Sequence, residues 1–292
     1  MLIQEKISAP DTLLKLYVAI DEDLKALYPQ LQSRQLPRDP RGGMPMLSAA
    51  EVLTILVWGA WRGRGDKAKV YFHVQTYHRP EFPTLGAYSK FVEATNRYSV
   101  ELRALLALTL HRNRQTQGAY PIVLQDSTAI AVCHVARAPQ HRTFQTWARK
   151  SKNGMGWWYG LKLHVQCDEV GRLCGVDVTT ATVDDRKLLD PLTCWMKDGI
   201  VVGDGGYLSQ RKAKELAQRG VYLLPATRKN MRHLASQFQL ACLQLRHRVE
   251  ELFEFMKGAF GAVRTTHRAA YALPIHLLCC LLAYSLYKSL IA

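Results

Sequence analysis

The sequence lacks a C-x-x-C pair, and its seven cysteines are scattered singly apart from the adjacent Cys279 and Cys280. Zinc ribbons are built on such pairs, so we expect no zinc ribbon and a reducing, cytoplasmic environment. The first 23 residues carry acids within their apolar periodicity, which does not fit a secretory signal peptide. The sequence also shows no internal repeat.

Acidic residues are scarce relative to basic ones, with 24 Asp and Glu against 39 Lys and Arg and a net charge of +15. This excess favours a polyanionic partner, because each neutralised phosphate releases counterions. An anionic membrane surface would attract the same charge. The one long apolar run, residues 272–292, is interrupted by Pro274, His276 and Lys288, which favours a buried terminal helix over a membrane span.

The first 115 residues have helical periodicity and no long strand pattern, so we predict an all-α N-terminal region. Asp11 can cap a helix that begins at Thr12, and Ser48 with Glu51 forms the sequence pattern of a capping box. Residues 36–45 form a Pro/Gly-rich connector. Further helical patterns cover residues 66–77 and 88–110.

The pattern changes in residues 116–292, which we predict to be an α/β domain. Apolar or alternating runs predict strands, and helical periodicity falls between the later ones. The strands are expected at 120–133, 159–167, 173–181, 200–204 and 221–227, and the helices at 185–198, 209–220 and 231–260. This order is that of the ribonuclease-H-like fold, a mixed sheet with helices on its faces.

Two acids occupy apolar strands of this predicted domain. Asp126 lies in the first strand and Asp204 ends the fourth, and the two strands are neighbours in a ribonuclease-H-like sheet. An acid in an apolar strand is costly unless it is paired or binds a metal. Carboxylates suit Mg²⁺, and two such ions about 3.5–4 Å apart can activate one oxygen and stabilise another in phosphodiester chemistry. Alternatively, each acid caps a turn.

A third acid can come from Glu250, Glu251 or Glu254 in the predicted final helix. At about 100° per residue, Arg246, Glu250 and Lys257 fall within roughly 40° of one another. The neighbouring stripe is apolar and should face the sheet. We therefore favour Glu250, with flanking cations that can hold phosphates. The alternative is an exposed stripe of ion pairs.

The spacing of Arg246, Glu250 and Lys257 is similar to the signature around the catalytic Glu of DDE transposases of bacterial insertion sequences. Leu243 stands where that signature usually begins with Tyr. The segments GWWYGLKLHV, VVGDGGY and LPATRKNM also resemble blocks of one compact group of these enzymes. The resemblance covers roughly residues 45–285. The spacings of the three acids leave no room for a large insertion domain.

The resemblance implies hydrolysis at transposon ends, followed by attack of the freed 3′-hydroxyl on target DNA. Asp126, Asp204 and Glu250 would bind two Mg²⁺ ions, for which Mn²⁺ substitutes. Arg246 and Lys257 would contact DNA near the cleavage site. The expected partners are double-stranded DNA, as terminal inverted repeats and target, and a second copy in a synaptic homodimer. Residues 1–115 would help to recognise the ends through a helix-turn-helix-like unit, and the bacterial protein would be nucleoid-associated and not membrane-bound.

Basic and aromatic residues interleave between Arg137 and Lys162. We expect phosphate contacts from the cations and base stacking from an aromatic ring, or else a basic loop whose aromatics join the core. The candidates are Arg149, Lys150, Lys152, Lys162, Trp157, Trp158 and Tyr159, with Arg228 and Lys229 beyond the fifth strand. His134, His141 and His164 fit no zinc motif, and we interpret them as ordinary polar or DNA-facing residues.

Three other functions compete with an active transposase. A ribonuclease-H-like endonuclease would cut DNA without strand transfer. A transposase-derived DNA-binding protein would have lost catalysis, although the presence of all three acids argues against that loss. A membrane-bound basic protein would explain the charge and the terminal apolar run.

Overall fold

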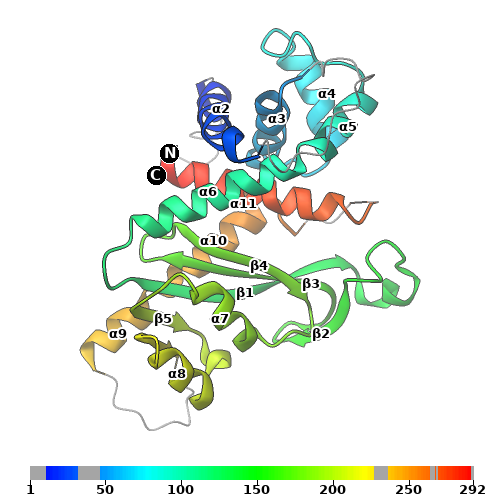
Figure 1. The fold of residues 1–292 in the computed structure, drawn as a ribbon. Coiled ribbons are helices and arrows are strands. Elements are labelled where there is room, and N and C mark those ends of the chain that lie inside the picture. The colour runs from blue at the N-terminus through cyan, green and yellow to red at the C-terminus, as the bar shows by residue number, and fades with distance from the viewer. Residues whose placement is uncertain (1–10, 32–46, 227–235, 264–266, 268, 291–292) are drawn as a thin grey trace. The chain divides into compact units, whose positions relative to one another are not determined.

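The computed structural model describes residues 11–31, 47–226, 236–263, 267 and 269–290. The chain forms two compact units. Unit 1 comprises residues 1–109 and 256–292, and unit 2 comprises residues 110–255. The described part of unit 1 is helical, and unit 2 contains the sheet (Figure 1).

Unit 1 is built from helices, as its periodicity predicts. They are α2 (Asp11–Leu31), α3 (Ala49–Trp61), α4 (Lys67–Tyr77), α5 (Tyr88–Arg97), most of α6 (Ser99–Gln115) and α11 (Ala272–Leu290). Every residue of α3 except Glu51 is buried, because α2, α4, α5 and α11 pack against it. The predicted capping box is present: Glu51 N–H donates to Ser48 Oγ at 3.2 Å, and Ser48 N–H donates to Glu51 Oε2 at 2.7 Å.

The helical pattern of residues 88–110 is divided into two helices. Tyr98 separates α5 from α6, and its N–H donates to the carbonyl of Ala94 at 3.0 Å. Local periodicity misses this break because apolar residues continue on both sides of it. Tyr98 is buried, so the break between the two helices lies inside unit 1.

The apolar helix α11 is long and apolar enough to cross a membrane by length and composition alone. In the structure 67% of its apolar window is buried, and it packs against α3. Cys280 and Leu282 are among its buried residues, and His276 is also buried and hydrogen-bonded to the carbonyl of Gly261 at 3.1 Å. These features are those of a core helix, as the interruptions in its sequence predicted.

Unit 2 contains a six-stranded mixed sheet. The strands are β1 (Ile122–Cys133), β2 (Arg149–Asn153), β3 (Gly156–Asp168), β4 (Leu173–Thr180), β5 (Gly199–Gly203) and β6 (Val221–Pro225). Their order is β2-β3-β1-β5-β6, with β4 also paired to β3. The pairs among β1 to β4 are antiparallel, whereas β1–β5 and β5–β6 are parallel.

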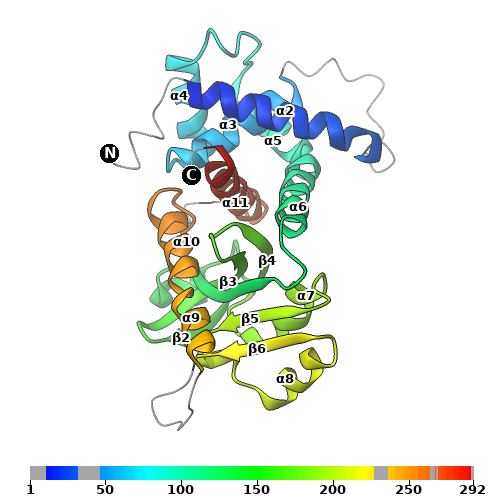
Figure 2. The same cartoon turned by 90° about the vertical axis from the view of Figure 1, so that its left-hand side faces the viewer.

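Helices cover both faces of this sheet (Figures 1 and 2). The short helix α7 (Leu189–Thr193) and α8 (Gln210–Ala217) lie on one face, and α9 (Gln237–Gln244) and α10 (His247–Gly258) lie on the other. The layer under α7 and α8 is an apolar cluster that includes Val123, Val201, Leu216 and Val221. The predicted mixed α/β fold of ribonuclease-H-like type, with a helical N-terminal region, is therefore confirmed.

Two predicted helices differ from the observed ones. The pattern over 231–260 contains α9 and α10, which are separated at Leu245 and Arg246, and its first residues lie outside the described ranges. The pattern over 185–198 forms only the 3-10 helix η3 (Asp185–Leu188) and the five-residue α7. Pro191 lies in the first turn of α7, where its missing N–H is tolerated.

Candidate active site

Asp126 and Asp204 come together because of the register between two parallel strands. In that register Ile122 lies beside Ile200, and Leu124 lies beside Val202. Continued along the strands, the same offset of 78 positions places Asp204, just beyond β5, beside Asp126. The two acids are therefore separated in the sequence by the same number of positions as the paired residues of β1 and β5.

Both carboxylates are on the face that α9 and α10 cover. Val123 and Val201 belong to the apolar layer under α7 and α8. Successive side chains of a strand point to opposite faces, so Leu124 and Asp126 point away from that layer. Asp204 keeps an extended backbone, with φ −75° and ψ 176°, and is two residues beyond Val202 on the same face. The two acids thus share one face at one strand end.

The environment of Asp126 disfavours its charge. Burial, with a smaller contribution from the nearby carboxylate of Asp204, raises the pKa of Asp126 to about 6. The N–H of Ser127, which donates to Asp126 Oδ1 at 2.7 Å, and the guanidinium of Arg246 oppose this rise. Within the described part of the chain, neither Asp126 nor Asp204 forms an ion pair with a cation. The negative charges of these two carboxylates are therefore not neutralised by a direct ion pair among the described residues.

Asp204 also has the turn-capping role that the sequence left open. It begins the 3-10 helix η4 (Gly205–Tyr207), and its Oδ1 accepts from Gly206 N–H at 2.8 Å. A Cβ at Gly206 would lie 2.9 Å from that oxygen, which explains the glycine. The turn holds the Asp204 carboxylate in place, and one of its oxygens, Oδ2, takes no part in the cap.

Glu250 lies in the first turn of α10 and is not gathered with the two aspartates. Its side chain is 62% exposed, and its Oε1 lies 3.6 Å from Nη2 of Arg246. Val249 and Leu252 form the buried stripe beside it, as predicted. Glu251 pairs instead with Arg248 at 3.2 Å. Among the described residues, no three His, Cys, Asp or Glu side chains are grouped so as to hold a metal ion.

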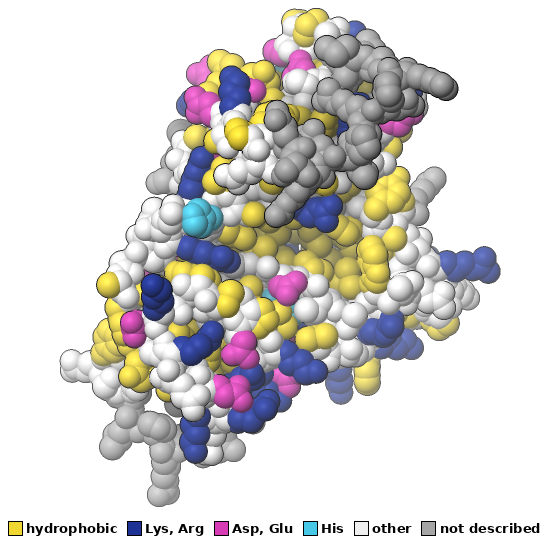
Figure 3. Space-filling view, viewed as in Figure 1, with side chains coloured by type: hydrophobic (Ala, Val, Ile, Leu, Met, Phe, Trp, Pro, Cys, Tyr) yellow, Lys and Arg dark blue, Asp and Glu magenta, His cyan; other side chains and the backbone are white. Residues whose placement is uncertain are grey.

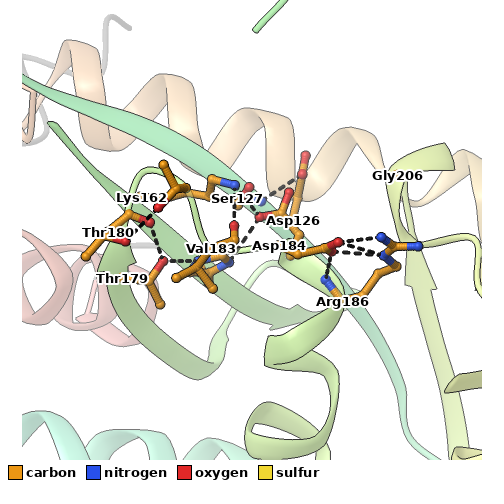
Figure 4. A network of polar contacts seen from close by, with 12 residues as sticks. Asp126, Ser127, Lys162, Thr179, Thr180, Val183, Asp184, Arg186 and Gly206 are labelled. Carbon is orange, nitrogen blue, oxygen red and sulfur yellow. Dashed lines mark hydrogen bonds and ion pairs between the residues drawn. The ribbon is translucent and has the colours of Figure 1, made fainter. Parts of the chain in front are cut away.

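Asp185 is a further acid near the pair that we did not select from the sequence. Its charge acts on both Asp126 and Tyr207, raising the pKa of each. Lys162 donates to Asp185 Oδ1 at 2.8 Å and to the carbonyl of Val183 at 2.9 Å, as Figure 4 shows for Val183. The only sequence signal for this acid is the pair Asp184 and Asp185 after the third predicted strand.

One prediction about β3 needs correction. His164 and Gln166 are fully buried, so the DNA-facing alternative for His164 is wrong. His164 Nε2 lies 2.8 Å from Thr179 Oγ1, and Trp195 Nε1 donates to Gln166 Oε1 at 3.0 Å. The alternation suggested one polar face, but that face is covered by the 179–195 segment, and the polar groups pair inside it.

The basic and aromatic segment forms η2 (Val135–Gln140), β2 and the first part of β3. Arg149 donates to the carbonyls of Gln145, Thr146 and Ala148, so its guanidinium holds the preceding loop. Trp157 is 63% exposed, whereas Tyr159 is only 7% exposed.

The remaining predicted residues are placed as follows. Trp158 is half-buried, His134 caps η2, and His141 stacks on Phe144 with ring centroids 5.6 Å apart. Lys257 lies in the last turn of α10. Arg228 and Lys229 lie outside the described residues.

Comparison with known proteins identifies the family. Residues 116–270, more than half of the chain, match the family model described as "Transposase DDE domain". The chain belongs to the DDE transposase family. This transposase has no match among curated proteins.

Solved structures of two transposases are similar to it. A piggyBac transposase in a synaptic complex with hairpin DNA matches with a TM-score of 0.52 and 13% identity, covering 95% of this chain and 74% of that one. A pre-cleavage Mos1 transpososome matches with a TM-score of 0.23 and 11% identity, covering 90% of this chain and 86% of that one. The first likeness shows a shared fold.

Proposed function

We propose that this DDE transposase cuts DNA at the ends of its element and joins the freed ends to target DNA, using Asp126, Asp204 and Glu250. One observation carries the proposal: Asp126 of β1 and Asp204, which directly follows the neighbouring parallel strand β5, are separated by the same 78 positions as the paired residues of these strands, and no cation pairs with either among the described residues. Two close carboxylates repel each other, and a bound divalent cation would offset that repulsion.

The residues present fit the divalent metal ions that DDE transposases generally use. All the proposed ligands are carboxylate oxygens, which hard cations such as Mg²⁺ prefer. We propose two Mg²⁺ ions, for which Mn²⁺ substitutes. When bound, such ions act as Lewis acids that activate an attacking oxygen and stabilise a leaving one.

The side chains around the pair have complementary tasks in this proposal. Asp126 and Asp204 would bind the metal ions. The hydrogen bond from Gly206 N–H keeps the Asp204 carboxylate oriented for this role. Glu250 turns from Arg246 toward the aspartates, which leaves the Arg246 guanidinium available for a phosphate. Lys257, further along the same helix, would contact flanking phosphates.

DNA is the partner that the charge of the chain favours. The net charge of +15 suits a polyanion, and the similar piggyBac structure is a synaptic complex with hairpin DNA. We propose that residues 116–292 form the catalytic part and that residues 1–115 help to recognise the terminal inverted repeats. Pairing of two ends would bring together two copies of the chain.

The test is metal-dependent cleavage of a duplex that carries the sequences flanking this gene. Mg²⁺ or Mn²⁺ should support cutting by the parent, and Asp126→Ala, Asp204→Ala and Glu250→Ala should each reduce it by about 100-fold or more, since even the outer-shell partners of metal ligands cost about 10- to 100-fold when replaced. Glu169→Ala, which removes an exposed acid in the turn between β3 and β4, is the matched control and should cut normally. DNA binding should survive in all four variants.

Other outcomes would select a different function. Binding of the ends without cutting by the parent would support a DNA-binding protein without catalysis. Cutting without joining, measured with pre-cleaved ends and a target plasmid, would support an endonuclease. Full cutting by Glu250→Ala would show that the third acid is another residue, with Glu251, Glu254 and Asp185 as the next to replace.

A further inference from the structure

The strands β2 and β3 form a hairpin with a two-residue tip. Arg149 to Asn153 pair with Gly160 to Gly156, and Gly154 with Met155 forms the loop. Met155 N–H donates to Asn153 Oδ1 at 3.0 Å, and Gly156 has φ +119°, a conformation that favours glycine. The backbone of the tip is thus defined by specific residues.

One face of this hairpin presents two lysines and a tryptophan. Lys152 lies directly opposite Trp157, and Lys150 lies directly opposite Tyr159, so the four side chains share a face. Lys150 and Lys152 are exposed, and Trp157 is 63% exposed with the Lys152 ammonium 6.0 Å from its ring centroid. Tyr159 is buried and anchors the base of this face. We name Lys150, Lys152 and Trp157 the hairpin face.

The charge around the hairpin face is of one sign. The sequence contains no Asp or Glu between Asp126 and Asp168. Figure 3 shows dark blue side chains and no magenta ones over this part of unit 2, at the right of the view. Lysines beside an exposed aromatic ring form the combination that binds nucleic acid, with cations on phosphates and the ring against a nucleotide.

The hairpin face is on the same side of the sheet as the proposed catalytic acids. Val165 of β3 lies directly opposite Asp126 of β1, so their side chains share a face. Trp157 is eight residues before Val165, an even number. The register shift in the β1–β3 pairing lies in β1, between Ala131 and Cys133, and β3 itself pairs without interruption with β2 over Gly156–Gly160 and with β4 from Leu161 to Val165, so its side chains keep alternating. Eight residues of strand measure about 26 Å. That length corresponds to about eight nucleotides at roughly 3.4 Å each.

We propose that the hairpin face contacts substrate DNA about eight nucleotides from the phosphate that is cut. Lys150 and Lys152 bind backbone phosphates, and the Trp157 indole packs against a nucleotide. This inference rests on the proposed function, because it takes the cut phosphate to lie at Asp126 and Asp204. Arg149 contributes indirectly, since its hydrogen bonds to the preceding loop hold the base of the hairpin.

The position of the contact can be measured by photocrosslinking. Duplexes carrying the sequences that flank the gene would contain a single 5-iododeoxyuridine at successive positions of each strand, and the parent's cut would define position zero. We expect Trp157 to crosslink six to nine nucleotides from the cut, as identified by mass spectrometry of the linked peptide. Trp157→Ala should lose this crosslink, and Trp147→Ala, which removes another exposed indole, should keep it.

The lysines are tested by the salt dependence of binding. Replacing both Lys150 and Lys152 with Ala should reduce the slope of log K against log salt by about 2, since each phosphate contact contributes about 0.9. Lys214→Ala, on the exposed surface of α8, is the control and should leave the slope unchanged.

The outcomes separate the two proposals. A duplex that the parent cuts, but on which Trp157 crosslinks elsewhere or not at all, would overturn this inference and leave the proposed function standing. An unchanged salt slope in the double lysine variant would also overturn it. A parent that neither binds nor cuts the ends would overturn both.

Discussion

The guanidinium of Arg246 lies 3.6 Å from the carboxylate of Glu250, one turn apart at the start of α10. The same guanidinium is close enough to Asp126 to lower the pKa of that carboxyl. The positive charge of Arg246 therefore interacts with two of the proposed catalytic acids, Glu250 and Asp126. Binding of metal and DNA would redistribute these interactions, since a phosphate and a divalent ion can each replace one partner.

Arg246→Gln should reduce metal-dependent DNA cleavage by about 10- to 100-fold, the loss expected from one charge-assisted hydrogen bond of roughly 1.5–3 kcal/mol. Loss of the nearby positive charge should also raise the pKa of Asp126, so the rise of the cleavage rate with pH should move to higher pH. Single-turnover cleavage between pH 5 and 9 measures both effects. Arg248→Gln, whose partner is Glu251, should change neither.

Asp126→Asn should stabilise the metal-free protein at pH 7.5. The folded state raises the pKa of Asp126 from 3.8 to about 6, so the folded state holds its proton more tightly than the unfolded state does. Stability therefore falls as pH rises between those values, by about 3 kcal/mol at most above pH 6. Thermal unfolding in EDTA should show the gain at pH 7.5 and none near pH 4. A gain of equal size at both pH values would contradict the burial of this carboxyl.

Lys162→Met should destabilise unit 2 and slow cleavage without removing an exposed cation. The Lys162 side chain is 16% exposed and donates to Asp185 and Val183, so its loss leaves a carboxylate and a carbonyl without their donor. We expect a cost of about 1–3 kcal/mol in urea unfolding. Asp185→Asn should reproduce part of this cost, whereas Asp184→Asn removes an exposed partner of Arg186 and should cost less. Equal costs for the two aspartate variants would argue against a special role of the Lys162–Asp185 pair.

Gly160→Ala should be strongly destabilising, by about 3 kcal/mol or more. A Cβ at this position would lie 2.0 Å from the carbonyl oxygen of Ile130, and backbone cannot move away as a side chain can. Gly160 pairs with both Ala131 and Arg149, so the strain would reach the base of the hairpin. Gly154→Ala, where a Cβ meets no neighbour, is the control and should leave the unfolding midpoint unchanged.

Several features of this transposase could be predicted from local sequence patterns. Ser48 and Glu51 form the expected capping box, and Ser209 is the N-cap of α8 as expected, although α8 ends at Ala217, before the predicted stop at Gly220. The strands β1 and β5 at the centre of the sheet could be predicted because both are apolar runs bounded by turn residues. The pairing of β1 with β5 followed from the element order, and the resemblance to DDE transposases agreed with it.

Other features depend on contacts between distant segments. The strand β2 is exposed along most of its length, so it lacks the apolar alternation of a strand and forms because β3 supplies its hydrogen bonds. Asp185 comes near Asp126 only because Lys162 and the 179–195 segment hold it there. His164 looks solvent-facing by alternation, yet it is buried, because periodicity does not report what covers a face.

The sequence by itself determined most of the helical and strand elements, the family and the spacing of 78 positions that equals the register between Asp126 and Asp204. It could do so because capping, periodicity and strand length are local properties of the chain. Only the tertiary structure decided that Asp185 comes near Asp126 and that Trp157 shares a sheet face with Asp126. Those relationships arise from pairing and packing between segments that are distant in the chain, which local patterns do not encode.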